Sequence, residues 1–243
     1  MKSIIMAAGY ATRLWPLTKN TPKPLLEVKG KPIIEHILAK ILKCDIDEVF
    51  IVTNDKFFKN FLEWNSTFKS KLKITVVNDR TKSNDDRLGS LGDIEYAVEN
   101  LNIQDDIMIV AGDNLFEFSL KEVEDIYYSK QKSVVALFDV KDLELAKLYG
   151  IVTIDHNGKI IHFEEKPKKP KSTLSSTGVY IYSKTTIQKL IDFIKTSGKK
   201  DKAGDFLHWL YNKEDVYTYV SKEQWFDIGN LEQLEKAKKE FKA

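Results

Sequence analysis

The amino-acid sequence predicts an α/β protein with a mostly parallel central sheet and helices on both of its faces. In the first half of the chain, short apolar runs typical of buried strands alternate with stretches of helical periodicity. Such alternation is typical of parallel strands joined by helical crossovers. The second half is richer in strands, and Asn157-Gly158 between two alternating runs indicates a β-hairpin. We therefore expect a mixed, β-rich second half attached to the parallel sheet.

The first half should contain four strands, because four short segments are rich in apolar and β-branched residues: 2–8, 48–54, 72–78 and 106–114. Helices are expected between them, at residues 33–42, 55–64 and roughly 91–101. The first helix carries apolar residues three and four positions apart, which is the spacing of one helix face. A polar stretch, "DRTKSNDDR", separates the third strand from the third helix.

The second half should continue with strands at residues 133–140, 149–167 (the hairpin), 177–183 and 216–220. Helices are expected near residues 184–196, 204–211 and 231–241. The chain contains no internal repeat, so residues 1–243 are expected to form one domain whose two halves meet near residue 115. No hexapeptide repeats follow the last helix, and we therefore expect no C-terminal β-helix domain.

Composition excludes several classes of protein. The 243 residues carry a net charge of +2 from 38 basic and 36 acidic side chains, without the basic excess of a nucleic-acid binder. Cys44 is the single cysteine, so no intramolecular disulfide can form, and we expect a buried thiol at a helix end. Neither a signal peptide nor an apolar run of the ~18 residues that suggest a membrane span is present. We therefore expect a cytoplasmic protein that binds neither nucleic acid nor membrane.

The loop at residues 7–23 is the strongest candidate for a binding site. It follows the first strand, and open α/β sheets bind ligands at the carboxyl ends of their strands. Its small residues let the backbone approach a phosphate closely. Arg13 and Lys23 add two cations, and Pro22 and Pro24 restrict the backbone around Lys23. On these residues alone, a surface loop with solvated charges fits equally well.

A series of motifs resembles the sugar-1-phosphate nucleotidylyltransferase family. The motifs occur in the family's order and cover nearly the whole chain: "AAGYATR", "PLT", "PKPLL", "GKPIIEHIL", "LGSLGDIEYA", "VAGDN", "YGIV", "FEEKPKKPKS", "STGVYIY" and "WFDIGN". They are most similar to the glucose-1-phosphate thymidylyltransferase and uridylyltransferase group. The chain departs from the pattern at Ala11, where the family has its second glycine, and at "KAGDF", where thymidylyl relatives carry an arginine in place of Ala203.

The resemblance implies a Rossmann-like fold of the GT-A type, with a nucleotide-binding half at about residues 1–115 and a sugar-phosphate-binding half at about 116–243. It also implies roles for individual residues: Arg13 and Lys23 would be catalytic, and Asp113 and Asp227 would bind the metal. The nucleotide would be bound by Ala8, Gly9, Asn78 and Gly89. The sugar phosphate would be bound by Gly150, Glu165, Lys166 and Thr177.

The implied reaction joins a nucleoside triphosphate and a sugar 1-phosphate with Mg²⁺ as the cofactor. Its nucleophile is a phosphate oxygen that is already ionised at neutral pH, so neither a histidine base nor a nucleophilic serine is needed. Two polyanions must meet, and catalysis is therefore mostly positioning and electrostatic stabilisation. Carboxylates, water and phosphate oxygens are the ligands that Mg²⁺ prefers.

Several alternatives remain open at this point. The resemblance favours a pyrimidine nucleotide, UTP or dTTP, with Asn78 and Gly89 beside the base. The "ND…NDD…SL" spacing also resembles cytidylyltransferases that act on phosphocholine or another phospho-alcohol. A catalytically silent nucleotide-sugar sensor would lack the lysine or an aspartate, which this chain keeps. A glycosyltransferase would need an Asp-x-Asp motif where "GDN" stands. A homo-oligomer is compatible with the sequence.

Overall fold

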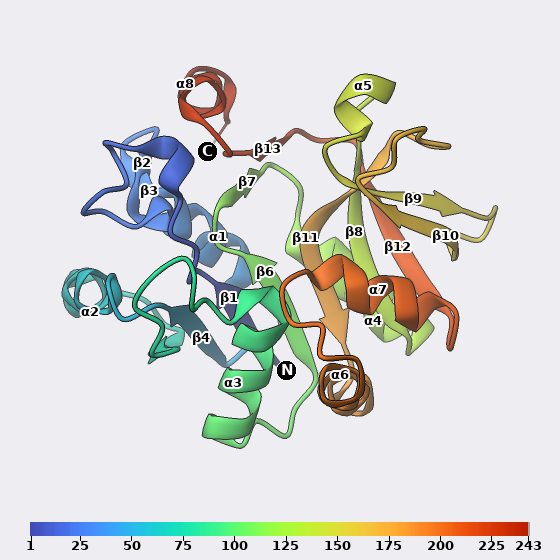
Figure 1. Ribbon diagram of the computed structural model, residues 1–243, viewed down its shortest axis with the longest axis horizontal. Coiled ribbons are helices and arrows are strands. Elements are labelled where there is room, and N and C mark those ends of the chain that lie inside the picture. Colours follow the sequence, from blue (N-terminus) through green and yellow to red (C-terminus); the bar gives the residue numbers. More distant parts are fainter. Residues whose placement is uncertain (243) are drawn as a thin grey trace.

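The structure is a computed structural model that describes residues 1–242. Within these residues, one main sheet is built from nine strands (Figure 1): β1 (Lys2–Met6), β4 (Glu48–Thr53), β5 (Lys73–Asn78), β6 (Ile107–Ala111), β8 (Ser133–Asp139), β9 (Gly150–Ile154), β10 (Ile160–Glu165), β11 (Leu174–Tyr182) and β12 (Val216–Ser221). Two small antiparallel ribbons lie outside it: β2 (Glu27–Val28) with β3 (Lys31–Pro32), and β7 (Asn114–Phe116) with β13 (Trp225–Asp227).

The first half of the chain forms the parallel part of the sheet. Its four strands lie in the order β6-β1-β4-β5, and each neighbouring pair is parallel. β1, β4 and β6 are almost entirely buried, because helices cover both faces, whereas in the outer strand β5 only Val77 is buried. Side chains alternate between the two faces as the strand period requires. Ile5 and Ile51 thus join one apolar core, while Ile4 and Val52 join the other. The predicted mostly parallel α/β sheet is confirmed.

The second half supplies the mixed part of the sheet. β11 pairs antiparallel with β6 and joins the two halves, and β8 pairs antiparallel with β11. β9 and β10 form the predicted antiparallel hairpin, whose turn contains Gly158 at φ +76°. A positive φ at this position is the reason that Asn-Gly favours such turns. β12 adds a parallel edge strand beside β8.

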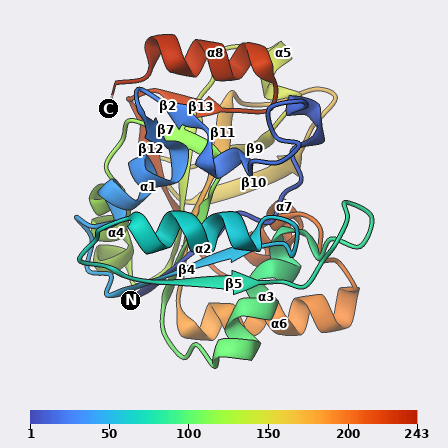
Figure 2. The same cartoon turned by 90° about the vertical axis from the view of Figure 1, so that its left-hand side faces the viewer.

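Eight α-helices are found among the described residues: α1 (Ile33–Ile41), α2 (Phe58–Thr67), α3 (Gly89–Leu101), α4 (Leu120–Lys130), α5 (Leu143–Ala146), α6 (Lys184–Ser197), α7 (Ala203–Tyr211) and α8 (Leu231–Glu240). α1, α2, α4 and α8 pack on one core, whereas α3, α6 and α7 pack on the other. α2 lies along the outer strand β5 (Figure 2). None of these helices is long and apolar enough to cross a membrane.

Several elements differ from the sequence expectation, and the short ribbon strands β2, β3 and β13 were not predicted. α4 and the short α5 were not predicted, although Leu120, Val123 and Tyr127 have helical spacing after the N-cap Ser119. The expected strand at 106–114 is broken, because β6 ends at Ala111 and Asn114 already belongs to β7. This break matters, since it places Asp113 in the turn between two strands.

Cys44 lies half-buried just beyond α1, and burial, with a contribution from the charge of Glu124, raises its pKa to about 12. Since the thiolate is the reactive form, only about 10⁻⁴ of this thiol is ionised at pH 8, against about a quarter of an ordinary cysteine. We expect alkylation of the folded protein by a maleimide at pH 8 to be at least ~100-fold slower than that of the urea-unfolded chain. Equal rates in the two states would contradict the burial of this thiol.

Candidate active site

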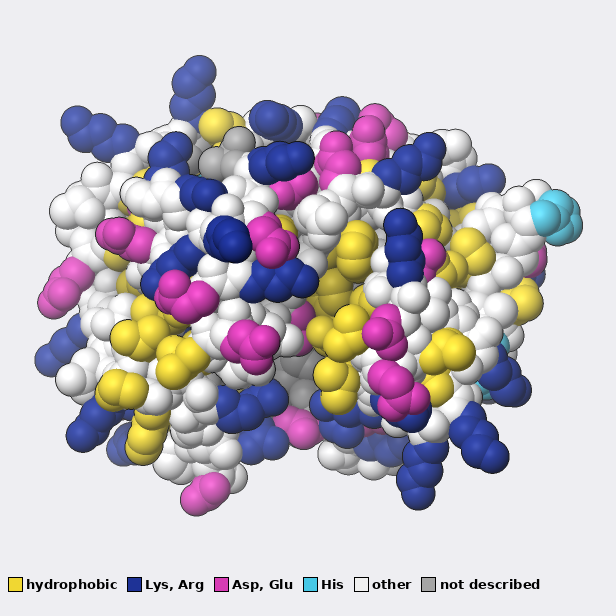
Figure 3. Space-filling view, turned by 90° about the horizontal axis from the view of Figure 1, so that it is seen from above, with side chains coloured by type: hydrophobic (Ala, Val, Ile, Leu, Met, Phe, Trp, Pro, Cys, Tyr) yellow, Lys and Arg dark blue, Asp and Glu magenta, His cyan; other side chains and the backbone are white. Residues whose placement is uncertain are grey.

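The carboxyl ends of β1 and β6 meet at one edge of the sheet, and a cavity of about 600 Å³ opens there. It is lined by the loop that follows β1, together with Lys23 and Asp113. Asp79, after β5, and the first turn of α3 also line it. The space-filling view from above shows a hollow between the two halves of this face, with charged side chains around it (Figure 3). The volume is within the range of small-molecule sites.

Side-chain donors that bind backbone carbonyls hold the loop after β1 in place. The Nδ2 of Asn54, at the end of β4, donates to the Ala8 carbonyl at 2.8 Å. Gly9 has open space where a Cβ would stand, so a ligand can approach its backbone. Ala11 adopts φ +47°, a left-handed conformation in which glycine would be unstrained. Its carbonyl accepts a 2.7 Å hydrogen bond from Thr18 Oγ1, which stabilises this conformation.

Lys23 and Asp113 form the charged centre of the site. The Lys23 Nζ lies 2.6 Å from Asp113 Oδ2 and donates to the Ile228 carbonyl at 2.5 Å. The lysine side chain is only 10% exposed, and it connects the N-terminal loop to the segment between β13 and α8. The Lys23 ammonium is therefore held in part by a carbonyl 205 positions further along the chain.

The structure brings Asp113 and Asp227 to the same place, although the two residues are 114 positions apart in the sequence. β7 and β13 pair antiparallel, with Asn114 opposite Asp227, and Asp113 directly precedes β7. Burial raises the pKa of the Asp227 carboxyl, and the negative charge of Asp113 adds to the rise. Three cations oppose this shift: Lys23, Arg13 and Lys166. Four of the charged residues implied by the motifs thus act electrostatically on a fifth, Asp227.

These two aspartates fit a divalent cation. No group of three or more His, Cys, Asp or Glu side chains among residues 1–242 could hold a metal by itself. Two carboxylates, one of them disfavoured by burial and by its neighbour's charge, nevertheless make a hard-oxygen donor pair that a cation would stabilise. Mg²⁺ is commonly bound in this way, by one or two carboxylates together with water and substrate phosphates.

A second, smaller cavity of about 300 Å³ adjoins the first, and Ser90 and Asp201 line both. Gly150, Glu165 and Asp227 are among its lining residues. A Cβ at Gly150 or Gly204 would stand 2.9 or 2.6 Å from Glu165 Oε2, so both positions leave room for that carboxylate. Burial raises the pKa of Glu165, whereas the charges of Lys166 and Lys202 lower it.

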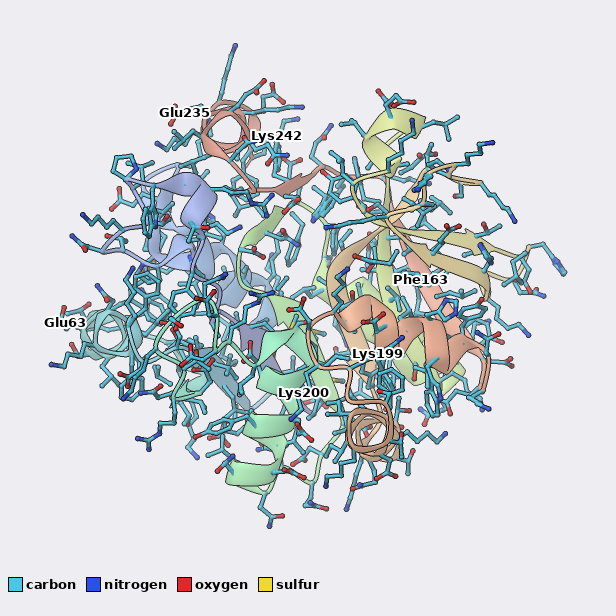
Figure 4. The ribbon with its side chains drawn as sticks, viewed as in Figure 1. Glu63, Phe163, Lys199, Lys200, Glu235 and Lys242 are labelled. Carbon is cyan, nitrogen blue, oxygen red and sulfur yellow. The ribbon has the colours of Figure 1, made fainter. Side chains whose placement is uncertain are left out.

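The segment before α7 forms part of the boundary between the two cavities. Ser90 and Leu91, at the start of α3, donate backbone hydrogen bonds to the carbonyls of Asp201 and Lys200, at 3.0 and 2.9 Å. Figure 4 shows Lys200 beside α3 and Phe163 near α7. Gly89 is required at this junction, because at φ +80° its Cβ would stand 2.4 Å from the Asp201 Cα.

Most of the implied site residues line one of the two cavities: Ala8, Gly9, Arg13, Lys23, Gly89 and Asp113 in the larger, and Gly150, Glu165 and Asp227 in the smaller. Lys166 is not among the lining residues, but its charge acts on Glu165 and Asp227.

Like Lys166, two further implied residues are absent from the lining of both cavities. The Nδ2 of Asn78 donates to Asp55 Oδ1 at 2.8 Å, and the next residue, Asp79, lines the larger cavity instead. Thr177 is fully buried, and its hydroxyl donates to the Ala136 carbonyl at 2.9 Å. Its neighbours Ser176 and Gly178 line the smaller cavity. Neighbouring side chains along a strand point to opposite faces of the sheet. A prediction that is one position off therefore selects a side chain on the other face.

Comparison with known proteins identifies the family of this chain. A profile of the family described as "Nucleotidyl transferase" matches residues 2–243. The chain belongs to this family. It is 30% identical over 233 residues to a candidate mannose-1-phosphate guanyltransferase of Sulfolobus acidocaldarius, an alignment that covers 94% of this chain and 60% of the relative. It is 31% identical over 232 residues to the bifunctional protein GlmU of Methanocaldococcus jannaschii, covering 94% of this chain and 51% of that protein.

The chain therefore spans about half to three-fifths of the length of these two curated relatives. Among solved structures, it is similar to a candidate glucose-1-phosphate thymidylyltransferase from Bacillus anthracis, with a TM-score of 0.83 and 26% identity. That match covers 98% of this chain and 94% of the other. The resemblance to sugar-1-phosphate nucleotidylyltransferases and the predicted fold class are both confirmed.

Proposed function

We propose that this protein transfers a nucleotidyl group from a nucleoside triphosphate to a sugar 1-phosphate and releases pyrophosphate. The observation that carries the proposal is the contact between Lys23 and Asp113 in the larger cavity. Their charges act on Asp227, which lines the adjoining smaller cavity. The larger cavity would hold the triphosphate and the smaller one the sugar phosphate. Relatives of this family are named for guanyl and thymidylyl transfer to sugar phosphates, which supports this division.

In the proposed reaction an oxygen of the sugar phosphate attacks the α-phosphorus of the triphosphate. The bond from that phosphorus to the oxygen bridging it to the β-phosphate breaks, and pyrophosphate leaves with the electron pair. Lys23 would stabilise charge at the α-phosphate, and Arg13 would bind the β- and γ-phosphates. Lys166 would attract the incoming sugar phosphate. Glu165 would accept hydrogen bonds from sugar hydroxyls, with the Gly150 backbone beside it.

Asp113 and Asp227 would hold a divalent cation, which we propose to be Mg²⁺. When bound, such an ion neutralises phosphate charge and stabilises the negative charge that develops on the leaving group. The chain would supply the two carboxylates and, beside them, the Lys23 ammonium. Loss of one such preorganised electrostatic group typically costs ~10²–10³ in rate.

A second candidate acceptor is phosphocholine or another phospho-alcohol. The smaller cavity is lined by Tyr149, Phe163, Tyr180 and Trp225 in addition to its polar groups. The Tyr149 and Trp225 rings stand edge to face at 5.1 Å. Aromatic faces of this kind can bind a quaternary ammonium group. Glu165, together with Asn114 and Ser176, instead favours a hydroxyl-rich sugar.

The proposal is tested by pyrophosphate release. The protein should be incubated with Mg²⁺, each of ATP, GTP, CTP, UTP and dTTP, and a panel of sugar 1-phosphates with phosphocholine as a further arm. We expect release with at least one sugar 1-phosphate, which also excludes a silent sensor subunit. Release with phosphocholine alone would favour the second candidate. No release with any pair would overturn the enzyme proposal.

A further inference from the structure

A third cavity, of about 660 Å³, lies outside the proposed active site. It is a groove between α1 and residues 68–71, which lie in the segment that joins α2 to β5. Since this segment comes just before β5, its wall of the groove lies near the amino end of that strand, whereas the proposed active site is at the carboxyl ends of the strands. The groove shares no lining residue with the other two cavities, so it is a separate surface.

One face of α1 forms the first wall of the groove. Its lining residues follow the spacing i, i+3, i+4 and i+7, which is one face of a helix: Glu35, Leu38, Ala39 and Leu42. This stripe extends roughly 10 Å along the helix axis, or about two turns. Leu38 is 1% exposed and belongs to the core, whereas Leu42 is 48% exposed. The groove therefore ends on a large apolar side chain that packing within the chain leaves in water.

Phe68 provides the apolar part of the opposite wall. Its ring stacks on that of Trp64, with the ring centroids 4.9 Å apart. Trp64 Nε1 in turn donates to Glu35 Oε1 at 2.9 Å, which connects α2 to α1. This hydrogen bond also engages an oxygen of Glu35, the single acidic residue among those that line the groove. The two walls are thus held against each other, and little negative charge remains between them.

Three exposed lysines give the rim of the groove a positive charge. Lys31 comes just before α1, and Lys69 and Lys71 lie on the opposite wall. None of their ammonium groups forms a hydrogen bond or ion pair with another of residues 1–242, whereas the nearby Lys73 pairs with Glu48 at 2.7 Å. Charge complementarity across an interface selects the partner, so this rim requires carboxylates beside apolar side chains.

We propose that the groove binds an acidic amphipathic helix of another protein. Helices that dock in grooves use apolar residues at i, i+3, i+4 and i+7, the same spacing as the α1 face that they would meet. The partner's apolar side chains would cover Leu42 and Phe68, and its carboxylates would face Lys69 and Lys71. A two-fold contact with a second copy of this chain would instead bring two sets of lysines together, which like-charge repulsion opposes.

The test is fluorescence anisotropy with a labelled peptide of about 15 residues, a length at which a helix begins to form. Its leucines are three and four positions apart, and glutamates fill the other positions. We expect a Kd below about 300 μM, as for a small transient interface, and at least ~10-fold weaker binding when lysines replace the glutamates. Absence of binding by the acidic peptide, or equal affinity for the two peptides, would overturn the proposal.

Charge reversal at the rim tests whether the peptide binds in the groove. Lys69→Glu combined with Lys71→Glu should weaken binding of the acidic peptide at least ~10-fold. Lys59→Glu combined with Lys132→Glu is the matched control, because it changes the net charge equally at exposed lysines outside the groove. Its affinity should stay within about threefold of the wild type, since distant exposed charges are screened by salt. Equal losses in the two double variants would overturn the assignment to this groove.

A leucine pair tests the apolar contact in the same way. Leu42→Gln should weaken binding of the acidic peptide about fivefold, because a half-exposed leucine would lose the burial that the partner provides. Leu62→Gln is the control, since Leu62 is 43% exposed on α2 but does not line the groove, and it should leave the affinity unchanged. All the replaced side chains are exposed, and circular dichroism checks that each variant folds. Unchanged binding in Leu42→Gln would contradict the proposed contact.

Two further measurements identify a different occupant of the groove. Sedimentation velocity would show a wild-type dimer that Lys69→Glu with Lys71→Glu converts to a monomer if a second copy covered the groove. Flotation with phosphatidylglycerol vesicles would show binding that the same variant loses if the groove received an anionic lipid. Either result would overturn the proposal, and we expect neither. Every readout here is binding or assembly, so the outcome does not depend on whether the protein releases pyrophosphate.

Discussion

Replacing Lys23 by methionine should lower the rate of pyrophosphate release by about 10²–10³-fold. The side chain places its ammonium 2.6 Å from Asp113 and donates to the Ile228 carbonyl, so it occupies one fixed position in the site. Methionine keeps most of the buried stem but removes the charge that the α-phosphate would meet. The loss should appear mainly in kcat, since an interaction that strengthens as charge develops acts on the transition state.

The matched control is Lys19→Met. Lys19 lies in the same N-terminal loop but is exposed and outside both cavities, so its loss should leave the rate within about twofold. Both variants should be checked by circular dichroism and thermal unfolding, because Lys23 also ties the loop to the segment after β13. A folded Lys23→Met protein with the wild-type rate would remove this lysine from the mechanism.

Most of the architecture and the two cations of the N-terminal loop could be inferred from the sequence because their signals are local. Apolar runs at residues 2–8 and 48–54 identify buried parallel strands, and Asn157-Gly158 identifies the hairpin whatever surrounds it. Arg13 and Lys23 could be proposed as binding-site cations because they lie in the loop after the first strand. Asp113 and Asp227 could be proposed only through the resemblance, since their proximity depends on the pairing of β7 with β13.

The details of both cavities could not be predicted, for a different physical reason. Side chains alternate across a strand, so choosing Asn78 instead of Asp79, or Thr177 instead of its neighbours, reverses the direction in which the side chain points. The burial of Asp79 and Asp93 is also invisible locally, because a polar stretch separates the two residues in the sequence. Only the folded chain buries both in the lining of one cavity.

Asp227→Asn should abolish most activity while leaving the metal-free protein at least as stable as the wild type. Burial and the charge of Asp113 both disfavour the Asp227 carboxylate in the absence of a cation. A neutral amide of the same shape removes that unfavourable charge, so the Tm in EDTA should not fall. The rate with Mg²⁺ should nevertheless drop about 10²–10³-fold, because one of two proposed metal ligands is lost. Activity and stability would thus move independently, as expected where a site retains a costly charge for function.

Magnesium dependence gives this prediction a second readout. Mg²⁺ should raise the Tm of the wild type, because a ligand that binds only the folded state stabilises it. The shift should be lost or strongly reduced in Asp227→Asn and in Asp113→Asn. Asp215→Asn is the control, since Asp215 pairs with Lys159 outside both cavities and its loss should leave the Mg²⁺ response intact. If Asp227→Asn kept both the wild-type rate and the wild-type Mg²⁺ response, the two carboxylates would not form the metal site, and the proposed chemistry would need another cation to bring the two anionic substrates together.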